Sequence, residues 1–408
     1  MTRFMSQGLM FSTKLTIPTK YYIARAFSTC FSLIFAIFYT KILGLENRSF
    51  ISYVMVISLL SSLILNSGLT YSLRFHLKLR IENFKYFIFF GLTTSLLSVF
   101  IMDLLLQIYA IKQYNPPKNL TLICLAYGFV SNLHIYIYDF LCSLEEYKNL
   151  SKIEYLTIPT QLTLFFGLLF CHFFSTAVNL LLSLIFSYLV NICFATLISR
   201  FQISMLIDLE YSRIKQILQA SWQYYGFGIS ITILDRLDKF VVGLFLPRQT
   251  LAIYSVSTGL VTPTRFIADA YSRLRVSNNT LISTKRRLET HNKKLVMLVL
   301  LLAFLLTLVI DKAVLILFGK HWHLSEYVVF AYILQEIFRF YYIRKILISF
   351  EEHRHNLVNW IVYSLIGFGI FNTFVMILLF GLIGAPLSAI ISYVIGSVFI
   401  SRREKSTK

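Results

Sequence analysis

The stretch GFGISITILDRLDKFVVGLFL, residues 226–246, decides the fold class because it places charged side chains inside a run long enough to cross a bilayer. At its centre lies Asp235-Arg236-Leu237-Asp238-Lys239. A charged side chain that faces lipid costs about 2.5–3.5 kcal/mol or more at the bilayer centre. These side chains must therefore face one another, a neighbouring helix or a wet cavity. The sequence predicts a membrane protein with a polar interior.

The composition of the 408-residue chain supports the same class. Hydrophobic residues make up 57% and charged residues 14%, and the mean hydropathy is +0.70. Crossing the hydrocarbon core takes roughly 20 helical residues, so the apolar runs predict an all-α integral membrane protein with about 12 transmembrane helices. The expected spans are residues 21–43, 49–70, 84–110, 120–142, 155–174, 177–199, 220–246, 250–271, 294–318, 325–347, 357–379 and 382–400.

The basic residues between these spans are distributed unequally. If both termini are cytoplasmic, the outer loops hold few Lys and Arg residues, namely Lys41, Arg48, Lys112, Lys118, Arg248, Lys312 and Lys320. The positive-inside rule therefore predicts cytoplasmic termini and a multi-pass protein of the inner (plasma) membrane. The net charge of +19 follows from this bias and favours contact with anionic membrane lipids. Because the basic residues are scattered over short loops, nucleic acid is not expected as a partner.

Patterns typical of catalysis or metal binding are missing from the sequence. Its five cysteines form no CxxC pair, and all lie in or beside apolar runs, so we expect them to be packing residues. No Gly-rich phosphate loop, His cluster or nucleophile elbow occurs. The acidic pairs Glu145-Glu146 and Glu351-Glu352 fall on expected cytoplasmic loops. We therefore expect no enzyme activity, no cofactor and no metal.

An internal repeat divides the chain into two halves. Residues 45–53 (LENRSFISY) can be laid over residues 246–254 (LPRQTLAIY), an offset of 201 residues (246 minus 45). Six spans in each half give two parallel lobes, related by an axis along the membrane normal. The expected parts are a cytoplasmic N-terminal segment (1–20), an N-lobe (21–199), a cytoplasmic linker (200–219), a C-lobe (220–400) and a cytoplasmic tail (401–408). Coincidence between two short interfacial turns is the alternative.

Two stretches also carry a resemblance to a known family. YTKILG at 39–44, followed by Tyr53 and NSGL at 66–69, resembles the first two helices of polysaccharide-repeat-unit flippases. LDRLDKFVVG at 234–243, followed by AIYS at 252–255, is similar to the seventh-to-eighth-helix signature of the same family. These are the O-antigen (Wzx-type) translocases of the multidrug, oligosaccharidyl-lipid and polysaccharide (MOP) exporter superfamily, whose fold is also that of MATE transporters. Pro247 departs from the family's usual turn residue, and the last four spans show no motif.

The resemblance implies a function as well as a fold. It implies a flippase that moves polyprenyl-diphosphate-linked oligosaccharide repeat units from the inner to the outer leaflet by alternating access, for lipopolysaccharide or other surface polysaccharide biosynthesis. It further implies contact with a polysaccharide polymerase. Two alternatives stay open: a membrane-embedded glycan polymerase or glycosyltransferase, and a multidrug exporter on the same fold. Short outer loops disfavour the first, and a cationic cleft disfavours the second.

Basic side chains inside the expected spans are candidates for substrate binding, because guanidinium and ammonium groups suit phosphate oxygens. These candidates are Arg25, Arg236, Lys239, Arg265 and Arg339. Each has a structural alternative. Arg265 could pair with Asp269 and Arg339 with Glu336, Arg236 and Lys239 could belong to a self-neutralising patch, and Arg25 could reach the cytoplasmic interface.

Acidic side chains inside the spans are candidates for coupling to a proton or sodium gradient. They are Asp103, Asp235 and Asp238. An unpaired carboxylate in an apolar setting resists ionisation, which suits proton coupling. The alternative is contact with outer water for Asp103 and structural ion pairing for Asp235 and Asp238. His134, in the middle of the fourth span, is expected to be a hydrogen-bonded packing residue rather than a proton relay.

Overall fold

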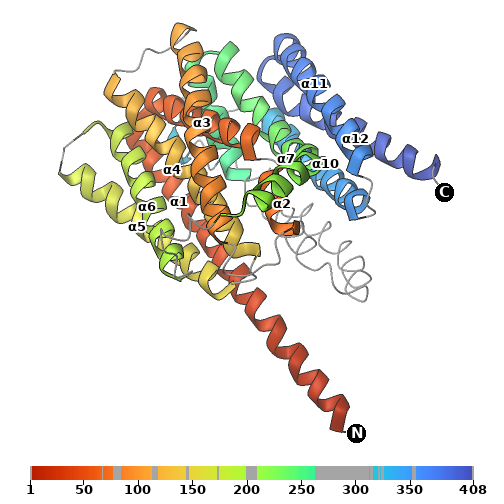
Figure 1. Cartoon of the computed structure of the whole chain (residues 1–408). Helices are drawn as coiled ribbons and strands as arrows, with labels where there is room; N and C mark the ends of the chain where they lie inside the picture. The colour runs from red at the N-terminus through yellow and green to blue at the C-terminus, as the bar shows by residue number, and fades with distance from the viewer. Residues whose placement is uncertain are drawn as a thin grey trace.

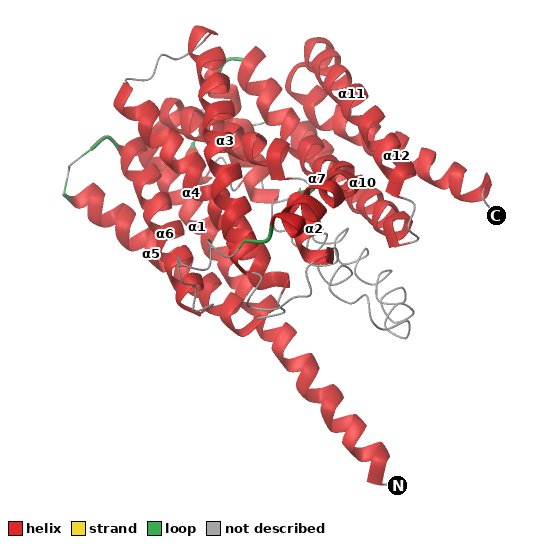
Figure 2. Cartoon of the chain, viewed as in Figure 1, coloured by secondary structure: helices red, strands yellow, loops and turns green. Residues whose placement is uncertain are grey.

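The structure of the chain is a computed structural model that describes residues 2–66, 68–76, 84–112, 118–143, 147–171, 174–198, 209–261, 312, 316–319, 322, 326–351 and 355–406. These residues are nearly all helical, and no strand occurs among them (Figure 2). The labelled helices are α1 (Thr2–Asn66), α2 (Leu69–His76), α3 (Phe84–Lys112), α4 (Lys118–Ser143), α5 (Tyr147–Phe170), α6 (Thr176–Ile198), α7 (Tyr211–Phe245), α10 (Glu326–Glu351), α11 (His355–Phe380) and α12 (Gly384–Ser406). A further helix is described over residues 248–261.

The helices follow the expected spans closely. The prediction of an all-α membrane protein is confirmed, and the expected spans that fall on described residues coincide with helices. Helix α7 begins at Tyr211, so it includes the second half of the expected linker 200–219. Residues 262–271 of the eighth expected span and most of the ninth, 294–318, lie outside the described residues.

The connection between the first two spans differs from the expected loop. Helix α1 contains both spans and is interrupted at Gly44 alone, where φ is 70° and ψ is 177°. A positive φ is strained for residues with a Cβ atom, and glycine adopts it freely. A Cβ atom at Gly44 would contact nothing within 4 Å, so the backbone angle and not lack of space favours glycine here. Arg48, expected in an outer loop, is therefore helical, and its side chain is buried.

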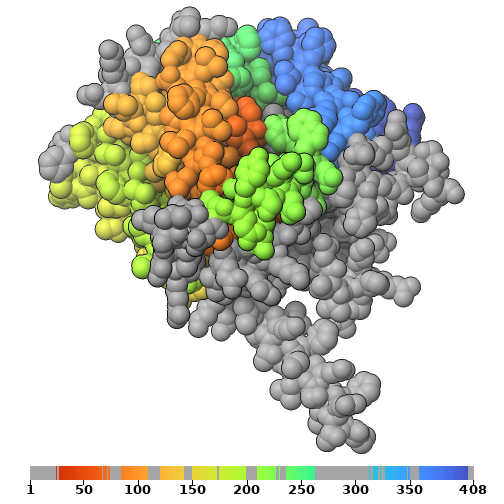
Figure 3. Space-filling view, in the orientation of Figure 1, coloured from red at the N-terminus to blue at the C-terminus, as the bar shows by residue number. Residues whose placement is uncertain are grey.

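The helices form two groups that meet along α7 (Figure 1). Helices α1 to α6 pack on one another, and α7, α10, α11 and α12 form the second group. Helix α7 contacts α1, α2 and α3 of the first group and α11 and α12 of its own. Its first turns reach the surface beside α3 (Figure 3). A buried apolar cluster that includes Tyr53, Ile57, Val242 and Tyr254 continues across the boundary and holds the groups together.

Long apolar helices mark the protein as a multi-pass membrane protein. Among the described residues, six segments are long and apolar enough to cross a bilayer: Phe27–Asn66, Phe84–Ile108, Leu120–Leu141, Asn149–Phe170, Thr176–Ile198 and Val358–Arg402. The first has 40 residues and the last 45, and each therefore has the length of two crossings at roughly 20 residues per crossing. Large apolar side chains on these helices, such as Phe100 and Leu197, are exposed, as expected for surfaces that face lipid.

Polar side chains fill part of the interior of the first group. Asn66 at the end of α1 donates to Ser62 (2.9 Å) and to Asn132 of α4, and it accepts a 2.8 Å hydrogen bond from Tyr136. Ser62 donates to Asn132 at 2.6 Å. Hydrogen-bonded polar groups are what an apolar interior tolerates, because an unsatisfied one costs free energy. The network fixes the end of α1 against α4, next to the place where α2 meets α7.

Candidate functional site

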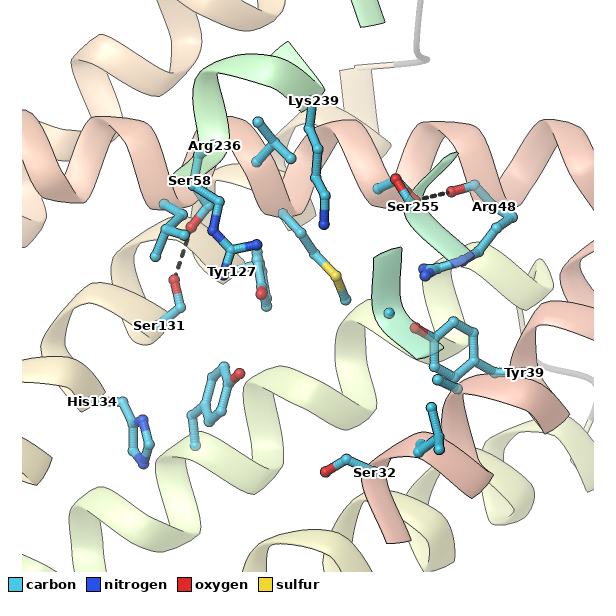
Figure 4. A pocket seen from close by; sticks show the side chains of 18 of the residues that line it. Ser32, Tyr39, Arg48, Ser58, Tyr127, Ser131, His134, Arg236, Lys239 and Ser255 are labelled. Atoms are coloured by element: carbon cyan, nitrogen blue, oxygen red, sulfur yellow. Dashed lines mark hydrogen bonds between the residues drawn. The ribbon is translucent and has the colours of Figure 1, made fainter. Parts of the chain in front are cut away.

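A cavity of about 550 Å³ lies where the two groups of helices meet (Figure 4). Both halves of α1, together with α4, α6, α7 and helix 248–261, contribute to its wall. Its volume is in the range of small-molecule sites, roughly 300–1,000 Å³. Hydroxyl groups line much of it, from Ser28, Thr29, Ser32, Ser52, Ser58, Ser131 and Ser255. Such a lining offers many hydrogen-bond donors and acceptors to a polar ligand.

Three basic side chains line the same cavity. Arg236 and Lys239 are three residues apart on α7, a spacing that places them on one face of the helix. Arg48 comes from the second half of α1. Figure 4 shows the nitrogen atoms of the three side chains entering the cavity from different sides. None of the described residues that line the cavity is acidic, so this described part of the lining carries a net positive charge.

Arg48 is the lining residue with the clearest unmet bonding capacity. It is only 7% exposed, and neither its Nε nor its Nη1 atom has a hydrogen-bond partner. Its Cζ atom lies 4.8 Å from the centre of the Tyr39 ring, a cation–π contact. Such a contact contributes about 0.5–2 kcal/mol, whereas burying a charge costs several kcal/mol, so Tyr39 offsets only part of the cost.

Arg48 is not among the predicted site residues, because the expected spans place it in an outer loop. A helical pattern was nevertheless readable. Arg48, Ser52, Met55 and Leu59 all line the cavity and follow the i, i+4, i+7, i+11 spacing of one helix face. The pattern becomes visible only if the second span starts before Arg48, and the turn at Gly44 is what allows that start.

Asp238 lies between Arg236 and Lys239 in the sequence, and it is held away from the cavity wall. Its carboxylate is buried and accepts a 2.6 Å hydrogen bond from the Tyr254 hydroxyl and a 2.7 Å bond from the backbone N–H of Lys239. Tyr254 in turn packs edge-on against Tyr332 of α10, with ring centres 6.2 Å apart. Asp238 therefore connects α7 to helix 248–261 directly beside the two basic residues.

Aromatic side chains form another part of the wall. His134 of α4 stacks on Tyr188 of α6 with ring centres 4.6 Å apart and an angle of 18° between the planes. The amide nitrogen of Asn191 lies 3.4 Å from Nε2 of His134. His134, Tyr188 and Tyr127 line the cavity, so His134 has both the packing contacts expected of it and access to a ligand. Flat aromatic faces of this kind are suited to stacking on sugar rings.

The remaining candidates from the sequence are placed elsewhere. Arg339 is buried on α10 and lies 3.5 Å from Glu336, the pairing given above as its structural alternative; it is not among the cavity-lining residues. Asp103 on α3 is partly exposed and accepts a 2.7 Å hydrogen bond from Gln107, and it also does not line the cavity. The side chains of Arg25 and Asp235, and the whole of Arg265, lie outside the described residues.

Comparisons with known proteins agree with this architecture. A family described as "polysaccharide biosynthesis protein" matches residues 40–329. A lipid II flippase, MurJ, in an inward closed conformation is 14% identical and superposes with a TM-score of 0.64 over 94% of this chain and 87% of that one. An inward-facing multidrug resistance MATE transporter of the MOP superfamily is 12% identical, with a TM-score of 0.62 over 93% and 95%. The eukaryotic MATE transporter AtDTX14 is 14% identical, with a TM-score of 0.61 over 96% and 95%.

At these identities the solved structures establish the fold that the chain shares with them. A search of curated proteins gave no match. The family match is different in kind, because it covers well over half of the sequence, from the end of the first expected span into α10, and includes both stretches that carry the resemblance except Tyr39. The chain therefore belongs to the polysaccharide biosynthesis protein family and has the helical membrane fold of MATE transporters and MurJ.

Proposed function

We propose that the protein is a flippase that moves polyprenyl-diphosphate-linked oligosaccharide repeat units, such as those of O-antigen or another surface polysaccharide, from the inner to the outer leaflet. The observation that carries this proposal is the cavity between the two groups of helices, which combines Arg48, Arg236 and Lys239 with hydroxyl and aromatic side chains. The family and the flippase fold of MurJ support it.

The chemistry of the cavity matches the two parts of such a headgroup. A diphosphate is multiply charged, and basic side chains form short charge-assisted hydrogen bonds with its oxygens. Sugar hydroxyls can exchange hydrogen bonds with the serine hydroxyls, and sugar rings can stack on Tyr127 or Tyr188. The polyprenyl tail needs no pocket, since it can stay in the lipid while the headgroup crosses. Arg25 and Arg265 remain further candidates for contact with the headgroup, whereas Arg339 pairs with Glu336 and is not among the cavity-lining residues.

Alternating access supplies the transport cycle in this proposal. An N-lobe (21–199) and a C-lobe (220–400) would rock against each other and open the cavity to each side in turn, with both termini in the cytoplasm and the protein in the inner membrane. A proton or sodium gradient, acting through Asp103, Asp235 or Asp238, would drive the cycle. Contact with a polysaccharide polymerase would deliver the translocated repeat unit to that enzyme. Catalysis is not part of the proposal.

A multidrug exporter is the nearest alternative, because the MATE structures share the fold. A cationic drug entering this cavity would meet basic side chains and no acidic residue among the described lining residues, which disfavours this alternative. A polymerase or glycosyltransferase would instead need carboxylates or other catalytic groups beside its substrate. The described lining offers hydroxyls, aromatic rings and basic groups, which favour binding of an anion.

The proposed function is tested by deleting the gene from a glycan-producing cell and by reconstitution. Deletion should cause lipid-linked repeat units to build up on the inner leaflet. In liposomes, the purified protein should move lipid-linked oligosaccharide between leaflets, and Arg236→Gln combined with Lys239→Gln should slow this movement at least tenfold. Lys85→Gln is the matched control, because Lys85 lies on α3 over the Tyr86 ring and away from the cavity. Unimpaired movement by the double variant, at normal protein levels, would reject the role given to these residues.

A further inference from the structure

An exposed aromatic cluster lies at the first turns of α7, away from the central cavity. Trp222 is 68% exposed. Its ring stacks on the ring of Tyr225, with the centres 5.9 Å apart and an angle of 12° between the planes, and it lies 6.2 Å from the ring of Tyr363 on α11. These three residues, the Trp222 cluster, are not among the residues that line the cavity. The transport function proposed above therefore leaves them without a role.

The length of α7 places the Trp222 cluster at the surface of the membrane. The helix has 35 residues and is about 52 Å long at 1.5 Å per residue, whereas the hydrocarbon core is about 30 Å thick. Its first turns carry the exposed residues Lys215, Gln216 and Gln219, so this is the end that extends beyond the hydrocarbon. Trp222 lies 23 residues before Phe245 (245 minus 222), or about 35 Å along the helix. That distance corresponds to the level of the lipid headgroups.

Two stripes of different chemistry run side by side on the exposed face of this segment. Tyr211, Leu218 and Trp222 follow the i, i+7, i+11 spacing of one helix face, and all three are exposed. Gln219 and Gln223 are also exposed, and each follows one of these residues directly in the sequence. The C–H groups of a sugar ring pack against the negative face of an aromatic ring, and amides both donate to and accept from hydroxyl groups. An acyl chain would make no use of the amides, so the pair of stripes favours a sugar.

Two hydrogen bonds fix the Trp222 cluster at the boundary between the two groups of helices. The Tyr225 hydroxyl donates a 2.8 Å bond to the carbonyl of Ile64 in α1, and Asn359 of α11 donates a 3.0 Å bond to the carbonyl of Gln223. The first turns of α7 lie at the surface, where a ligand outside the protein can reach them (Figure 3). A surface that is already ordered loses little conformational entropy when it binds a ligand.

We propose that Trp222, together with Tyr225, Gln219 and Gln223, is a docking site for a sugar ring of the lipid-linked oligosaccharide, separate from the central cavity. The inference rests on the proposed function, which places the first turns of α7 on the cytoplasmic side and the substrate in the inner leaflet. There the oligosaccharide projects from the headgroups at the height of Trp222. The site captures the substrate before its headgroup enters the cavity, so its loss weakens capture and leaves the crossing itself unchanged.

Transport kinetics in liposomes test the role of the site in capture. Trp222→Leu should raise KM for lipid-linked oligosaccharide by about fivefold or more and leave the maximal rate per folded molecule unchanged, as expected for the loss of an aromatic binding contact. Trp222→Phe keeps a ring and should keep most of the affinity. Tyr327→Leu is the matched control, because Tyr327 on α10 is also an exposed aromatic residue and lies outside the cluster. Its KM should equal that of the wild type.

A binding experiment separates a sugar from other ligands of this surface. The probe is the water-soluble oligosaccharide released by mild acid from the cell's own lipid-linked repeat unit. Saturation-transfer NMR with the full chain in nanodiscs of phosphatidylcholine should show binding to the wild type and to Tyr327→Leu, and none to Trp222→Leu. Binding that is lost in Tyr188→Leu but not in Trp222→Leu would place the sugar in the cavity alone and overturn the inference. An effect of Trp222→Leu that occurs only with anionic lipids would show a membrane anchor and overturn it as well.

The outcomes distinguish this inference from the proposed function. Trp222-dependent binding of the free oligosaccharide, in a protein that moves no lipid-linked oligosaccharide, would reject the proposed function and keep the site. Normal transport with the same KM in Trp222→Leu and the wild type, without Trp222-dependent binding, would keep the proposed function and reject the site.

Discussion

The hydroxyl of Tyr254 donates a 2.6 Å hydrogen bond to Oδ2 of Asp238, and both side chains are buried. The bond joins helix 248–261 to α7 at the level of the basic residues that line the cavity. Asp238 also accepts from the backbone N–H of Lys239. This carboxylate thereby fixes the turn of α7 that directs Arg236 and Lys239 toward the cavity.

Removing the donor should weaken this connection. Tyr254→Phe leaves Asp238 buried with one hydrogen bond fewer, and we expect a loss of about 1–3 kcal/mol in the free energy of unfolding, measured by denaturant titration in detergent. Tyr86→Phe on α3 is the matched control, because the Tyr86 hydroxyl is buried and has no hydrogen-bond partner. Removing this hydroxyl should leave the free energy of unfolding unchanged. Equal effects of the two variants would show that the Tyr254 bond contributes no stability.

The contact between α2 and α7 depends on the absence of a side chain at Gly68. A Cβ atom there would overlap the backbone carbonyl of Ser221, and Ser72 donates a 2.8 Å bond to the carbonyl of Ile217 beside it. We expect Gly68→Ala to push α2 away from α7 and to lower the free energy of unfolding by about 1–3 kcal/mol, which is the usual cost of overpacking. A cysteine introduced by Ser72→Cys should react with a thiol label faster when Gly68→Ala is present than when it is absent.

Gly167 provides the control for that prediction. It lies inside helix α5, and a Cβ atom would meet nothing within 4 Å. Gly167→Ala should therefore stabilise the protein by about 0.5–1 kcal/mol, as alanine does in a helix interior. Labelling at position 72 should not change. If Gly68→Ala were as well tolerated as Gly167→Ala, the close approach of α2 to α7 would not matter for stability.

Arg339 and Glu336 form a buried pair whose role is expected to be structural. Arg339→Ala leaves Glu336 buried without that partner and should cost about 3–5 kcal/mol of stability. Combining Arg339→Met with Glu336→Gln removes both charges and should recover most of the loss. Movement of lipid-linked oligosaccharide per folded molecule should then be near the wild-type rate. A double variant that is stable but inactive would instead place Arg339 in transport.

The carboxylates proposed for ion coupling can be compared directly. Asp103 is partly exposed and bonded to Gln107, whereas Asp238 is buried beside the cavity-lining basic residues. Asp103→Asn should leave gradient-driven transport within about twofold of the wild type, because this partly exposed carboxylate is bonded to Gln107 and is not among the cavity-lining residues. Asp238→Asn should slow it at least tenfold. Transport should be measured in liposomes with and without a proton gradient. If both variants keep gradient-driven transport at the wild-type rate, these two residues are removed from the coupling proposal.

The order of apolar and charged residues is sufficient to predict the fold class and two of the cavity residues, Arg236 and Lys239. Long apolar runs leave a chain in lipid no choice but to form helices, because every backbone N–H and C=O must be paired within the segment. The same rule singled out Arg236 and Lys239, since a charge inside such a run must face a polar interior. The break at the NSGL stretch was not predicted, because the expected second span, 49–70, ran through it; in the structure α1 ends at Asn66, and Gly68 lies where α2 meets α7.

Which charges share a cavity and which pair with a neighbour depends on how the helices pack, and this could not be predicted from the order of residues. For Arg339 the sequence left both a cavity role and a pair with Glu336 open, and it placed Arg48 in an outer loop; in the structure Arg339 lies beside Glu336, and Arg48 lines the cavity. The direction of a side chain on a helix depends on where the helix begins and on what packs against it. For Arg48 both follow from the non-helical backbone at Gly44, which separates two helices without a loop and lets the second begin before Arg48, so that a residue that a loop would have left in water is buried.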